Sequence, residues 1–191
     1  TNLGPIRSDT NALWDLAPHD VSIFYLLKKG MEPVTVSATG HKLLTTDQED
    51  VCFATMTYAD GTVAHLHVSW LEPHKVRSMV AVGDRQRVVF EDTNALEPLR
   101  VYYKGVSASD SLRLGGAPLG EILQYTDGDI LSVRCDASQP LTDQLGHFLH
   151  CVCSGEAPLS GPDAGVSVVR VLEACERSMR NGGAPVTVAD I

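Results

Sequence analysis

The first candidates for chemistry are an acid and a base, Asp15 and His19, four positions apart in the apolar segment LWDLAPHDVSIFYLL. In a helix, residues i and i+4 lie one above the other, so both side chains would point into the same space. A carboxylate beside an imidazole fixes the tautomer of the ring and raises its basicity, which suits removal of an alcohol proton near neutral pH. The spacing is therefore compatible with a catalytic pair. The alternative is a structural pair in which Asp15 satisfies a partly buried His19.

A second pair of histidines, His65 and His67, lies on an alternating segment and would share one face of a strand. Two histidines without a third ligand of known position are a weak metal signal, so we expect no metal site. We interpret them as part of a polar and aromatic sheet face that could form a dimer interface.

Two cations, Lys75 and Arg77, follow Pro73 in LEPHKVR and would lie on one side of a strand. Two cations on one side of a strand can converge on one anion, so this pair could meet a phosphate-bearing ligand. The alternative is ordinary solvated surface charge.

The acid and base lie in a segment with helical periodicity, 10–29, which Gly30 would end. Pro18 removes one helical hydrogen bond, so we expect a kink there or a helix that restarts at that residue.

The rest of the chain first alternates and then returns to helical spacing. Asp60-Gly61 is a strong hairpin signal. The expected strands are 34–39, 51–58, 62–70, 76–82, 87–91, 99–104, 130–135 and 186–188. Helices are expected after Pro140 and after Asp163, whereas segment 105–120 predicts no element. This order predicts one α+β domain over residues 1–191, with an open, predominantly antiparallel β-sheet and helices packed on one face.

Composition narrows the class of protein. The chain has 191 residues, of which 43% are hydrophobic and 20% charged, as in soluble globular proteins. Its net charge is -9 and its longest basic cluster is Lys28-Lys29, which argues against binding to nucleic acid or to an anionic membrane. No apolar run approaches the roughly 20 residues of a membrane span. Five irregularly spaced cysteines and no visible signal peptide indicate buried thiols in the cytoplasm.

The element order, the D-x-x-x-H helix and two late segments together resemble a known family. The late segments are PLTDQLGHFLHCVCSGEAP and GVSVVRVLEACERSMRNGGAPVTV. Over nearly the whole chain, the sequence resembles the C-terminal domain of the glucose-fructose oxidoreductase, inositol dehydrogenase and rhizopine-catabolism (Gfo/Idh/MocA) oxidoreductases. The opening NLGPIRSDTNALWDLAPHD is similar to members that act on nucleotide sugars in polysaccharide biosynthesis.

This resemblance implies a domain that binds a sugar or nucleotide-sugar substrate and forms a homo-oligomer through its sheet face. Asp15 and His19 match the acid and base of the family, with His19 as general base and Asp15 holding the ring in its productive tautomer. Many members carry paired glycines where this chain has Thr10 and Asn11. The residues that we expect to contact substrate are Arg7, Asn11, Trp14, Lys75 and Arg77.

The resemblance also implies a cofactor, NAD or NADP, that accepts the hydride. In the family a Rossmann domain, N-terminal to this one, binds most of the cofactor and supplies a lysine from a Glu-Lys-Pro motif. This chain has no Glu-Lys-Pro, and GGAPLG has the wrong glycine spacing for a dinucleotide fingerprint. We therefore expect the chain alone to be inactive, as the substrate half of a nicotinamide-dependent dehydrogenase. The alternative is a non-catalytic module for oligomerisation or ligand sensing.

Overall fold

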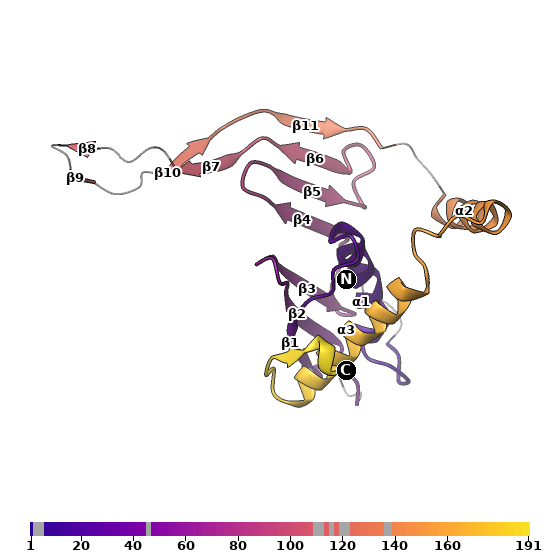
Figure 1. Cartoon of the computed structure of the whole chain (residues 1–191). Coiled ribbons are helices and arrows are strands. Elements are labelled where there is room, and N and C mark those ends of the chain that lie inside the picture. The colour runs from indigo at the N-terminus through magenta and orange to yellow at the C-terminus, as the bar shows by residue number, and fades with distance from the viewer. Residues whose placement is uncertain (2–5, 45–46, 109–112, 115–116, 119–122, 136–138) are drawn as a thin grey trace. The chain divides into compact units, whose positions relative to one another are not determined.

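The computed structural model describes residues 1, 6–44, 47–108, 113–114, 117–118, 123–135 and 139–191 (Figure 1). The chain divides into two compact units, the first made of Thr1–Lys75 with Gln139–Ile191 and the second of Val76–Ser138. The sequence patterns predicted a single domain and did not indicate this division.

The first unit contains a four-stranded antiparallel sheet in the order β12-β1-β2-β3. Its strands are β1 (Thr35–His41), β2 (Val51–Thr57), β3 (Val63–Ser69) and β12 (Val186–Thr187). The hairpin between β2 and β3 turns at Gly61, whose φ of 82° is a conformation that glycine adopts without strain. The Asp60 carboxylate accepts a hydrogen bond from the Thr62 N–H at 3.0 Å, which closes the turn. The hairpin predicted from Asp60-Gly61 is therefore confirmed.

Two helices, α1 (Ala12–Leu27) and α3 (Pro162–Arg180), cover one face of this sheet (Figure 1). Burial alternates along β1, β2 and β3, so every second strand residue faces the helices. The core between the layers includes Leu13, Ala17, Val21, Val36, Ala38, Cys52, Ala54, Met56, Leu66, Val68, Val171, Leu172 and Cys175. The predicted α+β class, with antiparallel strands and helices packed on one face, is confirmed.

Helix α1 runs unbroken through Pro18, so the expectation that the helix restarts at this residue is wrong. Leu13, Ala17 and Val21 are buried at helical spacing on both sides of the proline. Tertiary packing of such a face stabilises a helix more than propensity does, and here it offsets the hydrogen bond that proline removes. Past the helix end, Gly30 has a φ of 85°, in agreement with the predicted stop.

The loop between β1 and β2 fixes the start of α1. Asp50 is fully buried, and its carboxylate accepts hydrogen bonds from the backbone N–H groups of Leu43 and Leu44, the shortest at 2.8 Å. The neighbouring Glu49 accepts the Ala12 N–H through its carbonyl at 2.8 Å. Because Asp50 shapes the loop that carries Glu49, it sets where the first turn of α1 lies.

The second unit contains another four-stranded antiparallel sheet, in the order β11-β6-β5-β4. Its strands are β4 (Ser78–Val82), β5 (Arg87–Glu91), β6 (Leu99–Tyr102) and β11 (Ile130–Val133). Short strand pairs join β7 (Gly105–Ala108) to β10 (Leu123–Thr126) and β8 (Arg113–Leu114) to β9 (Ala117–Pro118). Strands β7, β8 and β9 lie in segment 105–120, for which the sequence predicted no element.

One face of the sheet in the second unit is apolar throughout. The strand register places on it Met79, Ala81, Val88, Phe90, Leu99, Val101, Leu131 and Val133. Among the described side chains of this unit, none is buried. Contiguous exposed apolar surface of this kind is typical of an interaction surface.

Helix α2 (Pro140–Ser154) forms where helical spacing predicted it. It ends at Gly155, which has a φ of 74° and donates its N–H to the Cys151 carbonyl at 2.9 Å. None of its residues is buried, although five of them are large and apolar. Among the described helices, none combines the length and the hydrophobicity that crossing a membrane requires.

Candidate active site

The Asp15 carboxylate, in the first turn of α1, is held by two donors from distant parts of the sequence. The indole Nε1–H of Trp70 donates to Oδ2 at 2.9 Å, and the Arg7 guanidinium donates to Oδ1 at 3.4 Å. The Asp15 side chain is 26% exposed, so one edge of the carboxylate remains accessible. Asp15 is therefore a fixed, partly accessible acid.

His19 lies one helical turn beyond Asp15 and is exposed. Within the part of the chain that the structure describes, nothing forms a hydrogen bond with its ring. The expected hydrogen bond between Asp15 and His19 is therefore not formed, and the donors to the Asp15 carboxylate are Trp70 and Arg7 instead. The structural alternative required a partly buried His19, and the exposed ring contradicts it.

Arg7 links Asp15 to Asp9. Its Nε and Nη2 donate to the two Asp9 oxygens at 3.0 and 2.7 Å, as a planar fork that matches a carboxylate. This pairing lowers the pKa of the Asp9 carboxyl and raises that of the Arg7 guanidinium. Both side chains are about half exposed or more, so an incoming anion can reach the guanidinium.

Asn11 and Trp14, which we expected to contact substrate, both have structural partners. The Asn11 side chain accepts the Trp14 backbone N–H at 3.1 Å and so caps α1, while its amide donates to Glu49 at 3.2 Å. The Trp14 indole donates to Glu176 on α3 at 2.9 Å. These contacts account for both residues without a ligand, and nothing in the sequence pattern indicated Glu49 or Glu176 as their partners.

Lys75 and Arg77 are not on a strand, because β4 begins at Ser78. The argument that strand alternation places both cations on one side is therefore wrong. Lys75 belongs to the first compact unit and Arg77 to the second, where Arg77 pairs with Asp92 at 3.3 Å.

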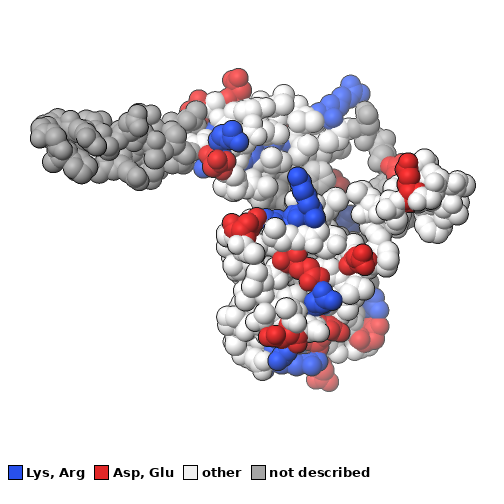
Figure 2. All heavy atoms as spheres, in the orientation of Figure 1, with Lys and Arg blue, Asp and Glu red and all other residues white. Residues whose placement is uncertain are grey.

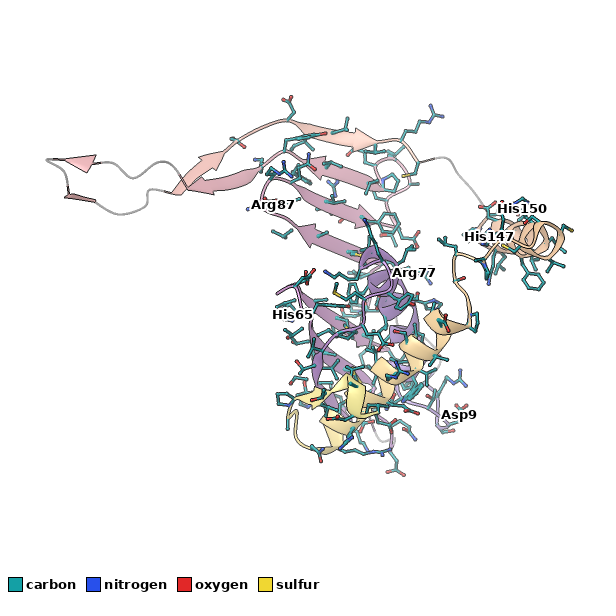
Figure 3. The ribbon with its side chains drawn as sticks, viewed as in Figure 1. Asp9, His65, Arg77, Arg87, His147 and His150 are labelled. Atoms are coloured by element: carbon teal, nitrogen blue, oxygen red, sulfur yellow. The ribbon has the colours of Figure 1, made fainter. Side chains whose placement is uncertain are left out.

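His65 and His67 share the outer face of β3, as predicted. Figure 3 shows His65 on this strand. The His65 ring lies 3.0 Å from the Thr55 hydroxyl, and His67 stacks on Phe53 with ring centroids 4.5 Å apart. Across the described residues, no group of three or more His, Cys, Asp or Glu side chains is placed to hold a metal ion. The face is therefore polar and aromatic.

A shallow groove of about 260 Å³ lies between α1 and the start of α3. Pro18 and Ser22 form one wall, and the start of α3 forms the other through Gly161, Ala164 and Gly165. Small residues on that wall let a ligand approach the backbone closely. Figure 2 shows acidic and basic side chains interspersed over the face in view, without a continuous basic patch.

The described residues contain no parallel sheet of the Rossmann type. Dinucleotides bind at the carboxyl ends of parallel strands in α/β sheets. Every strand pair in the described part of the chain is antiparallel.

Comparison with known proteins adds to this geometry. Residues 5–89 match the family model of the GFO/IDH/MocA C-terminal domain. A curated UDP-N-acetylglucosamine 3-dehydrogenase from Acidithiobacillus ferrooxidans is 33% identical over 106 residues, which are 53% of this chain and 31% of that protein.

Solved structures share the fold. One of UDP-N-acetylglucosamine 3-dehydrogenase from Acidithiobacillus ferrooxidans has a TM-score of 0.72 and 21% identity, and the match covers 95% of this chain and 51% of that one. The WlbA dehydrogenase from Bordetella pertussis, in complex with NADH and UDP-GlcNAcA, has a TM-score of 0.61 and 17% identity, with 93% of this chain and 45% of that one covered. This chain spans about half the length of these proteins. Residues 5–89, which include Asp15 and His19, are thus the part of the chain that is similar to the GFO/IDH/MocA C-terminal domain.

Proposed function

We propose that this chain is the substrate-binding and catalytic half of an NAD(P)-dependent oxidoreductase that acts on a hydroxyl of a nucleotide sugar. The observation that carries the proposal is the family match over residues 5–89, which contains an exposed His19 one turn from a fixed Asp15. The relative at 33% identity, a UDP-N-acetylglucosamine 3-dehydrogenase, supports the substrate class.

In the proposed reaction, His19 accepts the proton of the sugar hydroxyl as general base. A hydride leaves the same carbon for a nicotinamide nucleotide held outside this chain, so the alcohol becomes a carbonyl. Asp15 is fixed by its two donors, whereas the exposed His19 ring has no hydrogen-bond partner among the described residues and is free to rotate. We expect His19 to turn toward Asp15 and the substrate hydroxyl when the sugar binds.

Arg7 is the proposed contact for the negatively charged part of a nucleotide sugar. Its guanidinium fork is held by the exposed Asp9 carboxylate, and a diphosphate or carboxylate of substrate offers the same geometry. The substrate anion would displace Asp9 from the Arg7 guanidinium. It would then lie beside Asp15, to which Arg7 also donates a hydrogen bond.

The rival function is a non-catalytic module for assembly or ligand sensing. In that case His19 would serve the fold, and its exposed and unbonded ring contributes little to stability there. This exposure favours the catalytic assignment.

The proposed activity is tested on the intact protein with UDP-N-acetylglucosamine and either NAD⁺ or NADP⁺. We expect the absorbance of reduced nicotinamide to rise with nucleotide sugar and to stay flat with the cofactor alone. A protein that binds the nucleotide sugar but reduces neither cofactor, across a panel of sugars and nucleotide sugars, would be a sensing module instead.

We also propose a homo-oligomer that forms through the outer sheet face of the first unit. Phe53 is 44% exposed although it stacks on His67, and Val63 on the same face is 51% exposed. Replacing Phe53 with glutamate should shift the protein to monomer, because an unpaired carboxylate would have to be desolvated in the interface. Light scattering after size-exclusion chromatography measures this. Leu43→Glu, a charge at an exposed loop residue, should leave the oligomer intact, and equal behaviour of the two variants would rule out this face.

The cysteines fit a reducing compartment, and we propose a cytoplasmic location. All five are free thiols. Burial raises the pKa of Cys52 and of Cys175 to about 12, so both thiols stay protonated and unreactive near neutral pH.

A further inference from the structure

We propose that Trp70 is a positioning residue for the reaction, which it serves by holding the Asp15 carboxylate in place. The inference rests on the proposed function, because it assigns Trp70 a task only if Asp15 takes part in the chemistry. Trp70 follows the end of β3, 55 residues from Asp15 in sequence.

Trp70 is itself fixed at both ends. Its side chain is almost fully buried, with 2% of the residue exposed. Its backbone N–H donates to the carbonyl of the fully buried Asp50 at 3.0 Å. Its indole N–H donates to Asp15 Oδ2 at 2.9 Å. The indole N–H can donate a hydrogen bond but cannot accept one, so Trp70 is always the donor and Asp15 the acceptor.

The two donors to Asp15 differ in how easily they leave. Arg7 is 48% exposed, lies 3.4 Å from Oδ1 and makes shorter bonds to Asp9, so a bound anion can draw it away. Trp70 cannot withdraw without breaking the core that surrounds its ring. Oδ2 therefore stays anchored, and Oδ1 remains the edge that faces Arg7 and the solvent.

An anchored carboxylate matters because reacting groups tolerate little displacement. A misplacement of about 1 Å can cost about 100-fold in rate. If the indole N–H is lost, the Asp15 carboxylate can rotate about its side-chain bonds while Arg7 alone holds it. Substrate binding depends on other contacts, so the loss should fall on kcat and leave KM nearly unchanged.

The test is a double-mutant cycle in the intact protein, made of wild type, Trp70→Phe, Asp15→Ala and the double variant. Phenylalanine keeps an aromatic ring and removes the N–H. With UDP-N-acetylglucosamine and NAD⁺, we expect Trp70→Phe to lower kcat about 10- to 100-fold, with KM within about twofold. In the Asp15→Ala background the same change should lower kcat no further. Tyr58→Phe, which removes a hydroxyl from another buried aromatic residue, should keep wild-type kcat.

Thermal unfolding gives a second readout that is independent of activity. In wild type, Trp70→Phe removes a hydrogen bond, whereas in Asp15→Ala it removes an N–H left buried without an acceptor. The drop in Tm should therefore be smaller in the Asp15→Ala background, by about 2–4 °C for each 1 kcal/mol of coupling.

The outcomes separate this proposal from the proposed function. Wild-type kcat in Trp70→Phe, or an equal kcat loss in both backgrounds, overturns the role of Trp70 and leaves the proposed function standing if Asp15→Ala turns over measurably but with a lowered kcat. Full activity of Asp15→Ala overturns the roles of both Asp15 and Trp70, whereas a wild-type protein that reduces neither cofactor overturns the proposed function. Trp70 is supported as the positioning residue if Trp70→Phe lowers kcat without changing KM, and does so only when Asp15 is present. The smaller drop in Tm in the Asp15→Ala background supports the same role.

Discussion

Replacing His19 with asparagine in the intact protein is expected to lower kcat by about 10²- to 10⁴-fold, the usual contribution of a positioned general base. Asparagine keeps a polar side chain of similar size but cannot accept the hydroxyl proton near neutral pH. Steady-state kinetics with UDP-N-acetylglucosamine and NAD⁺ or NADP⁺ measures the effect.

The structure predicts that this variant keeps its stability. His19 is exposed, and among the described residues its ring has no hydrogen-bond partner, so the Tm should match wild type. His41→Asn provides a matched control, because His41 is another exposed histidine, at the end of β1. Near-normal turnover of His19→Asn, or loss of stability in step with loss of activity, would contradict the assignment of His19 as base.

Replacing Asp50 with alanine is expected to cost about 2–5 kcal/mol of the free energy of unfolding. The carboxylate is fully buried and accepts the backbone N–H groups of Leu43 and Leu44. A hydrogen bond to a charged group contributes about 1.5–3 kcal/mol, and water can replace part of the carboxylate's role at the exposed Leu43. Urea denaturation followed by circular dichroism measures the change.

Asp50→Asn is the matched comparison for this prediction. Asparagine has nearly the same shape and keeps one carbonyl oxygen that can accept from the loop, so it should lose clearly less stability than alanine. If alanine and asparagine were equally stable, and both within about 0.5 kcal/mol of wild type, the loop would not depend on Asp50.

Local patterns predicted much of the fold correctly. Leu13, Ala17 and Val21 follow the helical period, and Asp60-Gly61 supplies a turn that few other residue pairs favour. Both signals involve neighbours in sequence, which is why they can be read without the tertiary structure. The common stripe of Asp15 and His19 follows from the same helical period.

Contacts between distant residues could not be predicted in this way. Trp70 lies 55 residues from Asp15, and Glu176 lies 162 residues from Trp14. An indole N–H carries no sequence signal for the carboxylate that it will meet. Asn11 was expected to contact substrate, although its residue type also favours a helix cap, which is the role it takes.

The prediction that Lys75 and Arg77 lie on one side of a strand failed because the strand begins after both residues. Alternation places residues on faces only inside a strand, and these two precede β4 by one to three positions. Segment 105–120 was missed because strands of two to four residues are too short to show a period.

The most direct test of the account is a crystal structure of the intact protein with UDP-N-acetylglucosamine bound. We predict that a hydroxyl of the sugar lies about 2.6–3.2 Å from a ring nitrogen of His19, with the Asp15 carboxylate still bonded to Trp70. A sugar bound away from α1, or a His19 ring enclosed by apolar side chains in the intact protein, would contradict the claim that this helix presents the base to its substrate.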